Sequence, residues 1–249
     1  GGIFVRSAEQ ISLEDRILLQ SVARVIISDN QGSLTEQVNR RGPQERRVAR
    51  LVPSRIHRPE PAVLETPLPA DQQLHNGLGG YSADGREDVI TTLQTRTTPL
   101  PWVNILASPG FGSVISESGI AYTWSENAHE FPLSPWNDDA VGASSGEAFY
   151  LRDEETRYFW SPTPLPCRGA QPYVSRHGFG YSVFEHTTQG IRSELRVYVD
   201  LEQPVKFIVL KVRNNSGRTR RLSATGYVEW VLGDLRAKTA MHVVTEIDA

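Results

Sequence analysis

Four of the five tryptophans of this chain, Trp102, Trp124, Trp136 and Trp160, lie within residues 99–166. Pro, Ser, Thr, Asn or Glu stands next to each of them, and none lies in an apolar run. A sugar ring has an apolar C–H face that stacks on an aromatic ring and a hydroxyl edge that needs hydrogen-bond donors and acceptors. The chemistry that this segment could perform is therefore carbohydrate recognition.

Burial in a protein core is the alternative for each ring, because tryptophan buries a large apolar area wherever it can. For any single tryptophan the two interpretations are about equally supported. Trp136 and Trp124 favour sugar contact most, because polar loop residues surround them, whereas Trp102 fits the core better. The candidate carbohydrate-binding residues are Trp124, Glu126, Asn127, Trp136, Asn137, Asp138 and Trp160.

Glycoside hydrolysis uses two carboxylates at a defined separation. Glu126, Asp138 and Asp139 are the acidic residues of the aromatic segment. Adjacent aspartates point in different directions and make a poor pair, and residues 153–155 are typical of a solvated hairpin tip. We therefore expect no catalytic residue, and we predict that the chain is not itself an enzyme.

Other chemistries find little support in the sequence. There is no Walker-type phosphate loop and no Gly-x-Ser-x-Gly elbow. His177 and His186 fall on different predicted elements without a third ligand, so we expect no metal and no other cofactor. Cys167 is the only cysteine, which excludes an intrachain disulfide. The adjacent Arg168 could lower the pKa of its thiol, but an incidental cysteine is the better-supported interpretation.

Charge and hydropathy exclude two further classes. The formal net charge is −3 and the isoelectric point is about 6.1, which does not indicate nucleic-acid binding. No apolar run approaches the length of a membrane span. The chain begins with Gly-Gly-Ile-Phe and without a signal-peptide pattern, so we expect a segment of a longer protein.

The N-terminal part, residues 1–39, predicts a short strand followed by a helix. The helix is expected to begin at the N-cap Ser12, with Asp15 three residues later, and to end near Ser28. Residues 33–38 are expected to add one or two helical turns. Residues 40–73 are rich in Arg and Pro and predict an extended linker. Its arginines could contact phosphate or lipid headgroups, but a solvated linker is favoured.

From residue 74 to residue 249 the pattern is that of an antiparallel β-sandwich, with short alternating segments between turn residues. Residues 89–95 predict one strand. The predicted hairpins pair residues 113–116 with 121–124, 147–152 with 158–160, 180–186 with 191–199, and 205–214 with 219–230. The chain is long enough for such a domain to bury a substantial core.

The order of motifs in this β region resembles that of the cyclic β-1,2-glucan synthases. The motifs that carry the resemblance are Asn-Gly-Leu-Gly-Gly-Tyr (76–81), Pro-Trp-Val-Asn (101–104), Ser-Pro-Gly-Phe-Gly (108–112), Tyr-Thr-Trp-Ser-Glu-Asn (122–127), Ser-Pro-Trp-Asn-Asp-Asp (134–139), Gly-Glu-Ala-Phe-Tyr-Leu-Arg-Asp-Glu (146–154), Trp-Ser-Pro-Thr-Pro-Leu-Pro (160–166), Arg-His-Gly-Phe-Gly-Tyr (176–181) and Tyr-Val-Glu-Trp-Val-Leu-Gly (227–233). The resemblance runs from about residue 74 to the end, and the first helix is similar to the segment that precedes it. Only the Pro/Arg-rich linker has no counterpart.

The resemblance implies the fold and the setting of the domain. It implies a mainly β, galactose-mutarotase-like supersandwich at the N-terminal side of a glycoside phosphorylase module of glycoside hydrolase family 94, formerly glycosyltransferase family 36. Further strands are expected to follow residues 245–248, so the sheet would be truncated here and its edge could pair with another copy. The catalytic residues would lie in an (α/α)6 barrel outside this chain. The parent would be a bacterial, membrane-anchored glycosyltransferase at the cytoplasmic side of the inner membrane, with this segment itself soluble and without membrane contact.

Two functions follow from the resemblance, and the sequence leaves both open. The first is a non-catalytic sandwich that binds β-1,2-glucan, or a related glucooligosaccharide, and lines the active site of a module that trims glucan with inorganic phosphate. The second is a structural module that docks the barrel and supports a homodimer. In related phosphorylases the sandwich of one subunit lies near the active site of its partner, so residues 124–139 could shape that cleft.

Overall fold

The computed structural model describes residues 5–23, 25–39, 66, 69–136 and 145–246 of the chain. It divides into two compact units, residues 1–53 and 54–249, and each is described by itself. The boundary between them lies within the predicted linker. Among the described residues, no helix combines the length and the apolar character that crossing a membrane requires.

The described residues of the N-terminal unit include two short helices, α1 (Leu13–Val22) and α2 (Leu34–Asn39), with 3₁₀ turns at Ala8–Gln10 and Asp29–Gln31. The predicted cap of the first helix is confirmed, because the Ser12 hydroxyl accepts the Asp15 main-chain N–H at 3.1 Å. The helix ends at Val22, well before Ser28, because the β-branched residues that follow favour extended backbone. The predicted first strand falls largely on residues 1–4, which lie outside the described residues.

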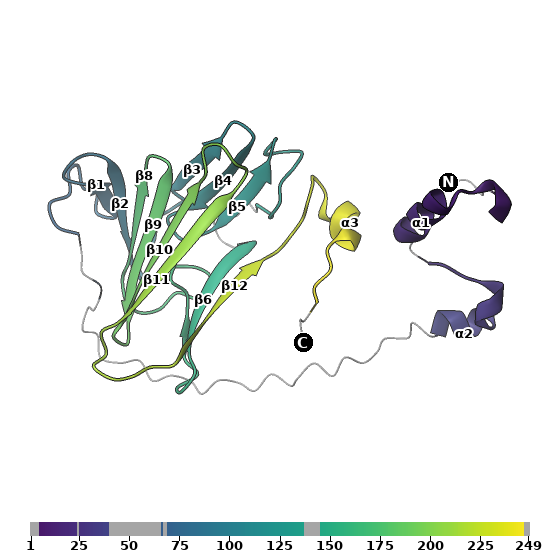
Figure 1. The fold of residues 1–249 in the computed structure, drawn as a ribbon. Coiled ribbons are helices and arrows are strands. Elements are labelled where there is room, and N and C mark those ends of the chain that lie inside the picture. Colours follow the sequence, from purple (N-terminus) through teal and green to yellow (C-terminus); the bar gives the residue numbers. More distant parts are fainter. Residues whose placement is uncertain (1–4, 24, 40–65, 67–68, 137–144, 247–249) are drawn as a thin grey trace. The chain divides into compact units, whose positions relative to one another are not determined.

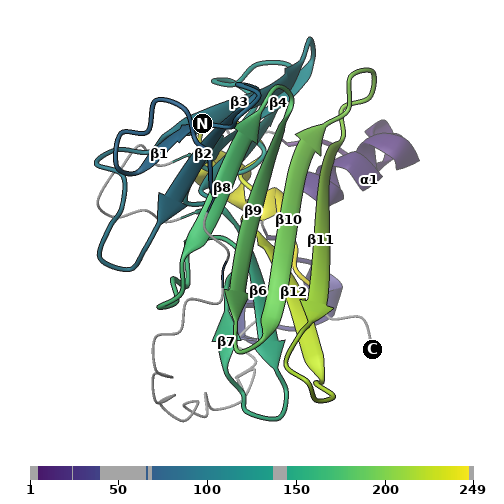
Figure 2. The same ribbon diagram turned by 90° about the vertical axis from the view of Figure 1, so that its left-hand side faces the viewer.

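The larger unit is built on one antiparallel sheet of six strands (Figures 1 and 2). Its strands, in spatial order, are β1 (Gly79–Tyr81), β2 (Glu87–Thr92), β8 (Tyr173–Gly178), β9 (Tyr181–Thr188), β10 (Ile191–Val199) and β11 (Lys206–Asn214). Alternation along β10 places Leu195, Val197 and Val199 in the core and leaves Arg196 on the opposite face. Strand β8 was not predicted from the sequence.

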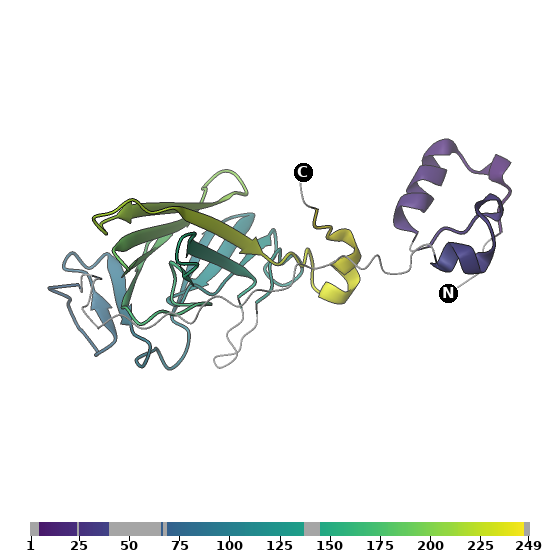
Figure 3. The same cartoon turned by 90° about the horizontal axis from the view of Figure 1, so that it is seen from below.

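Two three-stranded sheets cover the inner face of the large sheet, as the view in Figure 3 shows. The first has the order β3 (Val103–Ser108), β4 (Phe111–Ser116), β5 (Ala121–Ser125), and the second has the order β12 (Leu222–Val228), β6 (Glu147–Asp153), β7 (Phe159–Trp160). One core cluster joins Leu106 and Phe111 to Phe184 and Leu195, and another joins Leu151 and Trp160 to Ile191. The mainly β antiparallel sandwich is therefore confirmed.

Three of the four predicted hairpins are present: β4 with β5, β6 with β7, and β9 with β10. The fourth prediction, a pairing of residues 205–214 with 219–230, is wrong. Strand β11 pairs with β10, whereas β12 pairs with β6 in another sheet. The segment between β11 and β12 is therefore a crossover from one layer of the sandwich to the other.

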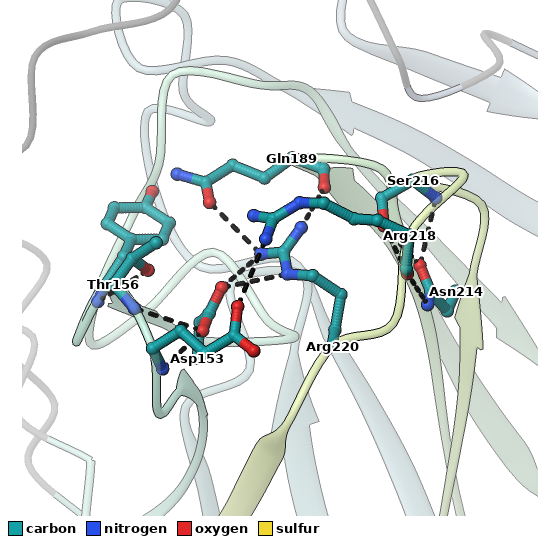
Figure 4. Close-up of polar contacts among 9 residues, drawn as sticks. Asp153, Thr156, Gln189, Asn214, Ser216, Arg218 and Arg220 are labelled. Atoms are coloured by element: carbon teal, nitrogen blue, oxygen red, sulfur yellow. Dashed lines mark hydrogen bonds and ion pairs between the residues drawn. The ribbon is translucent and has the colours of Figure 1, made fainter.

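A buried ion pair holds this crossover (Figure 4). The Arg220 Nε atom lies 2.9 Å from Asp153 Oδ2, and both side chains are at most 2% exposed. Arg220 Nη1 also donates to the main-chain oxygen of Gln189 at 2.9 Å. The main-chain N–H groups of Glu155 and Thr156 donate to Asp153 Oδ1. The Asp153–Arg220 pair therefore joins three turns, and it lies where the chain passes from β11 to β12, the strand that pairs with β6.

Strands β11 and β12 form edges of their sheets and expose apolar side chains, among them Phe207, Val209, Tyr227 and Val228. An edge strand presents unpaired main-chain groups to a partner. The prediction that such an edge pairs with another copy stays a prediction.

Candidate functional site

Three aromatic rings gather on and beside β5. Tyr122 and Trp124 are two residues apart on the same face of this strand, and their ring centroids lie 5.3 Å apart. The Trp136 ring, from the loop after the strand, also lies 5.3 Å from Tyr122. All three rings are partly exposed. Two of the three candidate tryptophans, Trp124 and Trp136, therefore lie beside Tyr122, and we call these three rings the aromatic cluster.

An open groove of about 560 Å³ lies next to this cluster. Its volume is within the range of small-molecule sites. Two segments that are about a hundred residues apart in the sequence form its walls, and its lining residues are Tyr122, Ala128, His129, Pro132, Pro135, Trp136, Glu229, Val231, Gly233, Asp234, Leu235 and Arg236. We refer to this site below as the aromatic groove.

The first wall is a segment that folds back along β5. Glu126 has a positive φ of 58°, which turns the chain, and the Asn127 side-chain oxygen accepts the N–H groups of His129 and Glu130 at 2.8 and 3.0 Å. The segment then returns antiparallel to the strand, with Leu133 N donating to Thr123 O at 2.7 Å. This local geometry places Trp136 beside Tyr122.

The second wall follows β12. Val231 N donates to Leu133 O, and Gly233 N donates to Pro132 O, each at 2.9 Å. The short helix α3 (Arg236–Thr239) completes this wall. No local sequence pattern connects residues 229–236 with β5, so the sequence did not predict that these residues form part of the site. The match of the Tyr-Val-Glu-Trp-Val-Leu-Gly motif was the only signal near them.

The lining includes two carboxylates, and each of them is paired with a cation. Glu229 and Asp234 contribute carboxylates, and Arg236 contributes a guanidinium that forms an ion pair with Glu229. Asp234 pairs with Lys238 at 3.2 Å. Burial raises the pKa of the Tyr122 hydroxyl, which therefore stays protonated and available as a hydrogen-bond donor at neutral pH. The groove thus combines flat rings with donors and acceptors, as sugar recognition requires.

The seven predicted site residues have different outcomes. Trp136 lines the groove, while Trp124 lies beside Tyr122 with its ring over Gly112, where a Cβ atom would lie 2.3 Å from Trp124 Cζ2. Glu126 and Asn127 are exposed in the turn that leads to the groove. Asn137 and Asp138 lie outside the described residues.

Trp160 needs a correction. It is 0% exposed and packs against Leu151 and Ile191 in the core. The structure therefore contradicts sugar contact by this side chain, because a ring without exposed surface cannot stack on a ligand. The alternation of the two-residue strand β7 decided this, because it turns Phe159 outward and Trp160 into the core, and the polar residues that follow Trp160 in the sequence did not reveal it.

Metal and thiol chemistry gain no support from the part of the chain that the structure describes. No group of three or more potential metal ligands is present among those residues. His177 and His186 lie on β8 and β9, and burial lowers the pKa of each to about 4. Burial raises the pKa of the Cys167 thiol, which is opposite to the effect that Arg168 could have had.

A comparison with known protein families shows to which family this chain belongs. Residues 86–249 match the model of the family described as glycosyl hydrolase 94, supersandwich domain. The chain belongs to this family. The match includes β3 to β12 and both walls of the aromatic groove.

The relatives to which the chain is similar are a glucan synthase and glycoside phosphorylases. The chain is 37% identical over 179 residues to the cyclic β-(1,2)-glucan synthase NdvB of Rhizobium meliloti (strain 1021), a match that covers 72% of this chain and 6% of that protein. It is 29% identical to the N,N'-diacetylchitobiose phosphorylase of Vibrio furnissii, over 66% of this chain and 20% of that enzyme. It is 31% identical to the solabiose phosphorylase of Paenibacillus borealis, over 63% of this chain and 20% of that enzyme. The chain thus spans only a small part of each relative.

Proposed function

We propose that this chain is a non-catalytic sandwich domain that binds β-1,2-glucan, or a related glucooligosaccharide, in the aromatic groove. The observation that carries the proposal is the pair of rings, Tyr122 and Trp136, standing 5.3 Å apart at the wall of a groove of about 560 Å³. Rigid aromatic rings supply a large contact area at a low cost in conformational entropy. The names of the relatives, a β-1,2-glucan synthase and two disaccharide phosphorylases, support a saccharide as the ligand.

The charges of the groove support a neutral ligand. Each of the two carboxylates that line it is paired with a cation, Arg236 or Lys238, so the groove has no net positive charge to attract phosphate or a sugar phosphate. A glucan has no charge and offers hydroxyl groups to Glu229, Asp234 and His129. In the parent protein, the groove would hold or guide the glucan chain next to the active site of a phosphorylase module. The catalytic groups of that module would come from outside this chain, which by itself would have no enzymatic activity.

A structural role is the second candidate, and a specific observation favours it. Strands β11 and β12 expose apolar side chains, including Phe207 and Tyr227, at the edges of their sheets. Such surfaces commonly mark contacts with another domain or subunit. In this case the sandwich would dock the (α/α)6 barrel and support a homodimer of a membrane-anchored parent, and the aromatic groove would be incidental.

Tryptophan fluorescence separates the two candidates. Titration with linear β-1,2-glucan should shift the emission of the chain, and Trp136→Ala or Tyr122→Ala should weaken the affinity by about tenfold or more. Trp102→Ala is the matched control, because Trp102 is partly exposed and belongs to neither wall of the groove. This substitution changes the total emission of the chain, but it should leave the affinity for glucan as it is in the wild type. If the emission of the wild-type chain does not shift at millimolar glucan, the binding proposal is wrong and the structural role remains.

A second measurement tests the absence of catalysis. The chain is incubated with β-1,2-glucan and inorganic phosphate, and glucose 1-phosphate is assayed. We expect none to form, because the two carboxylates of the groove, Glu229 and Asp234, are each held in an ion pair, with Arg236 and Lys238. Release of glucose 1-phosphate would overturn the non-catalytic assignment.

A further inference from the structure

A buried cluster of polar side chains lies behind the aromatic groove. Glu147, the first residue of β6, accepts hydrogen bonds at Oε1 from the hydroxyls of Thr123 and Ser134, each at 2.6 Å. Its Oε2 atom lies 2.5 Å from the Lys206 ammonium, and the two side chains are 8% and 9% exposed. Lys206 also donates to Ser113 Oγ at 2.9 Å and to Thr123 Oγ1 at 3.2 Å. The cluster therefore joins strands from all three sheets.

The hydrogen bonds of this cluster are complete. The three ammonium protons of Lys206 have three acceptors. Burial alone would raise the pKa of Glu147, but the Lys206 charge and the hydroxyls of Ser134 and Thr123 outweigh burial and hold it below its ordinary value. The carboxylate is thus ionised at neutral pH. A satisfied, buried and charged network of this kind has one arrangement, which makes it a rigid support.

Ser134 connects the cluster to the groove. Its side chain is 0% exposed, donates to Glu147 and accepts the Thr123 main-chain N–H at 2.9 Å. Pro135 follows, and its ring packs against Gly146 so closely that a Cβ atom there would lie 2.3 Å from Pro135 Cδ. Trp136 comes next. The chain therefore has little freedom between the buried hydroxyl and the exposed ring.

We propose that Ser134, held by the Glu147–Lys206 pair, is a positioning residue of the aromatic groove. It determines where the Trp136 ring stands relative to Tyr122, although neither Ser134 nor Glu147 lines the groove. The inference rests on the proposed function, because Trp136 matters only if the groove binds a saccharide. A positioning role differs from a role in stability alone, because its loss should change the surroundings of Trp136 and leave the other end of the sandwich unchanged.

The test uses the full chain with 5-fluorotryptophan in place of tryptophan, and reads one fluorine resonance for each of the five tryptophans. Trp136→Phe assigns the Trp136 resonance. Ser134→Ala removes the link to Glu147 and should shift or broaden this resonance, while that of the buried Trp160 stays in place. Ser193→Ala is the matched control, because Ser193 is also a 0% exposed serine, and its hydroxyl donates to the main-chain oxygen of His186. It should leave the Trp136 resonance unchanged.

The outcomes separate positioning from stability. A Trp136 resonance that is the same in folded Ser134→Ala as in the wild type overturns the inference, as does an equal shift in Ser193→Ala. If Ser134→Ala does not fold, Ser134→Cys is measured, since its thiol keeps the size and is a weaker donor. A smaller shift is then expected, and an unchanged resonance overturns the inference.

Titration with β-1,2-glucan completes the experiment. If the wild type binds, Ser134→Ala should bind about tenfold more weakly, and Ser193→Ala should bind as the wild type does. Equal affinity of Ser134→Ala and the wild type, despite a shifted Trp136 resonance, overturns the role in the groove. If the wild type itself does not bind, the proposed function fails, while the fluorine spectra still decide whether Ser134 positions the Trp136 ring.

Discussion

The two ends of β6 carry the same chemistry and serve different purposes. Its first residue, Glu147, and its last, Asp153, are both buried carboxylates, and each is paired with a buried cation, Lys206 or Arg220. At the Asp153 end, all the contacts go to turns that connect strands (Figure 4). At the Glu147 end, the contacts go to side chains of two strands and to Ser134, which leads to the aromatic groove.

The difference shows how one type of interaction can support either topology or a site. The Asp153–Arg220 pair holds the crossover that sends β12 to β6, so its loss should affect the whole sandwich. The Glu147–Lys206 pair supports the loop that presents Trp136, so its effect should include the geometry of a surface. The two ends can therefore be tested against each other.

The largest effect is expected at the Asp153 end. Asp153→Ala leaves the Arg220 guanidinium buried without its carboxylate, and should lower the free energy of unfolding by about 3–5 kcal/mol. Urea denaturation measures this loss. The fluorine resonance of Trp136 should stay where it is in the wild type, and a shift as large as that of Ser134→Ala would mean that the two ends are not independent.

Acid should destabilise the chain without distinguishing the two ends. Burial holds the pKa of His177 and of His186 at about 4 in the folded state, against 6.5 for the ordinary side chain. The unfolded chain therefore takes up more protons than the folded chain as the pH falls through this window, and stability is lost. From about pH 7 to about pH 5, we expect a loss on the order of 1–2 kcal/mol for each histidine.

The carboxylates sharpen this prediction. For Asp153, burial would raise the pKa, but the N–H groups of Glu155 and Thr156 and the Arg220 guanidinium hold it below its ordinary value. Its contribution to stability is present above the unfolded pKa and is lost only as the pH falls below that value. Urea denaturation of the wild type and of Asp153→Ala should thus show equal losses between about pH 7 and about pH 5. A smaller loss in the variant would show that Asp153 titrates in this window.

A smaller effect is expected from crowding at the Glu147 end. Gly146→Ala places a methyl group against the Pro135 ring, where the Cβ atom would lie 2.3 Å from Cδ. The segment must move, which should lower the free energy of unfolding by about 1–3 kcal/mol. Glucan affinity should fall with it, because Trp136 is the next residue after Pro135. Unchanged affinity in a destabilised Gly146→Ala chain would count against the link between this segment and the groove.

The smallest effect concerns the exposed neighbour of the Asp153 pair. Arg218 Nη1 lies 3.1 Å from Glu155 Oε2, but both side chains are about half exposed. Arg218→Ala should change the free energy of unfolding by less than about 1 kcal/mol, since water screens an exposed pair. Urea denaturation beside Asp153→Ala measures the contrast. Comparable losses in the two variants would refute the view that burial makes the Arg220 pair important.

The sequence by itself determined the local elements of this protein. Turn residues such as Ser118-Gly119 and Gln189-Gly190, with alternating apolar residues on either side, were enough to predict three hairpins that the structure contains. The polar surroundings of Trp136 indicated an exposed ring, and this ring lines the groove. These features depend on neighbours within a few residues, and for that reason a single sequence reveals them.

Only the tertiary structure decided what depends on distant contacts. Strand β12 pairs with β6, and not with β11, and the buried Asp153–Arg220 pair, 67 residues apart in sequence, lies at this crossover. Trp160 is in the core because β7 turns it toward Leu151 and Ile191, although polar residues follow it in the sequence. The second wall of the groove, and the path from Glu147 to Trp136, arise from segments that meet only after folding. No local pattern encodes such contacts, because their free energy depends on burial that the whole fold creates.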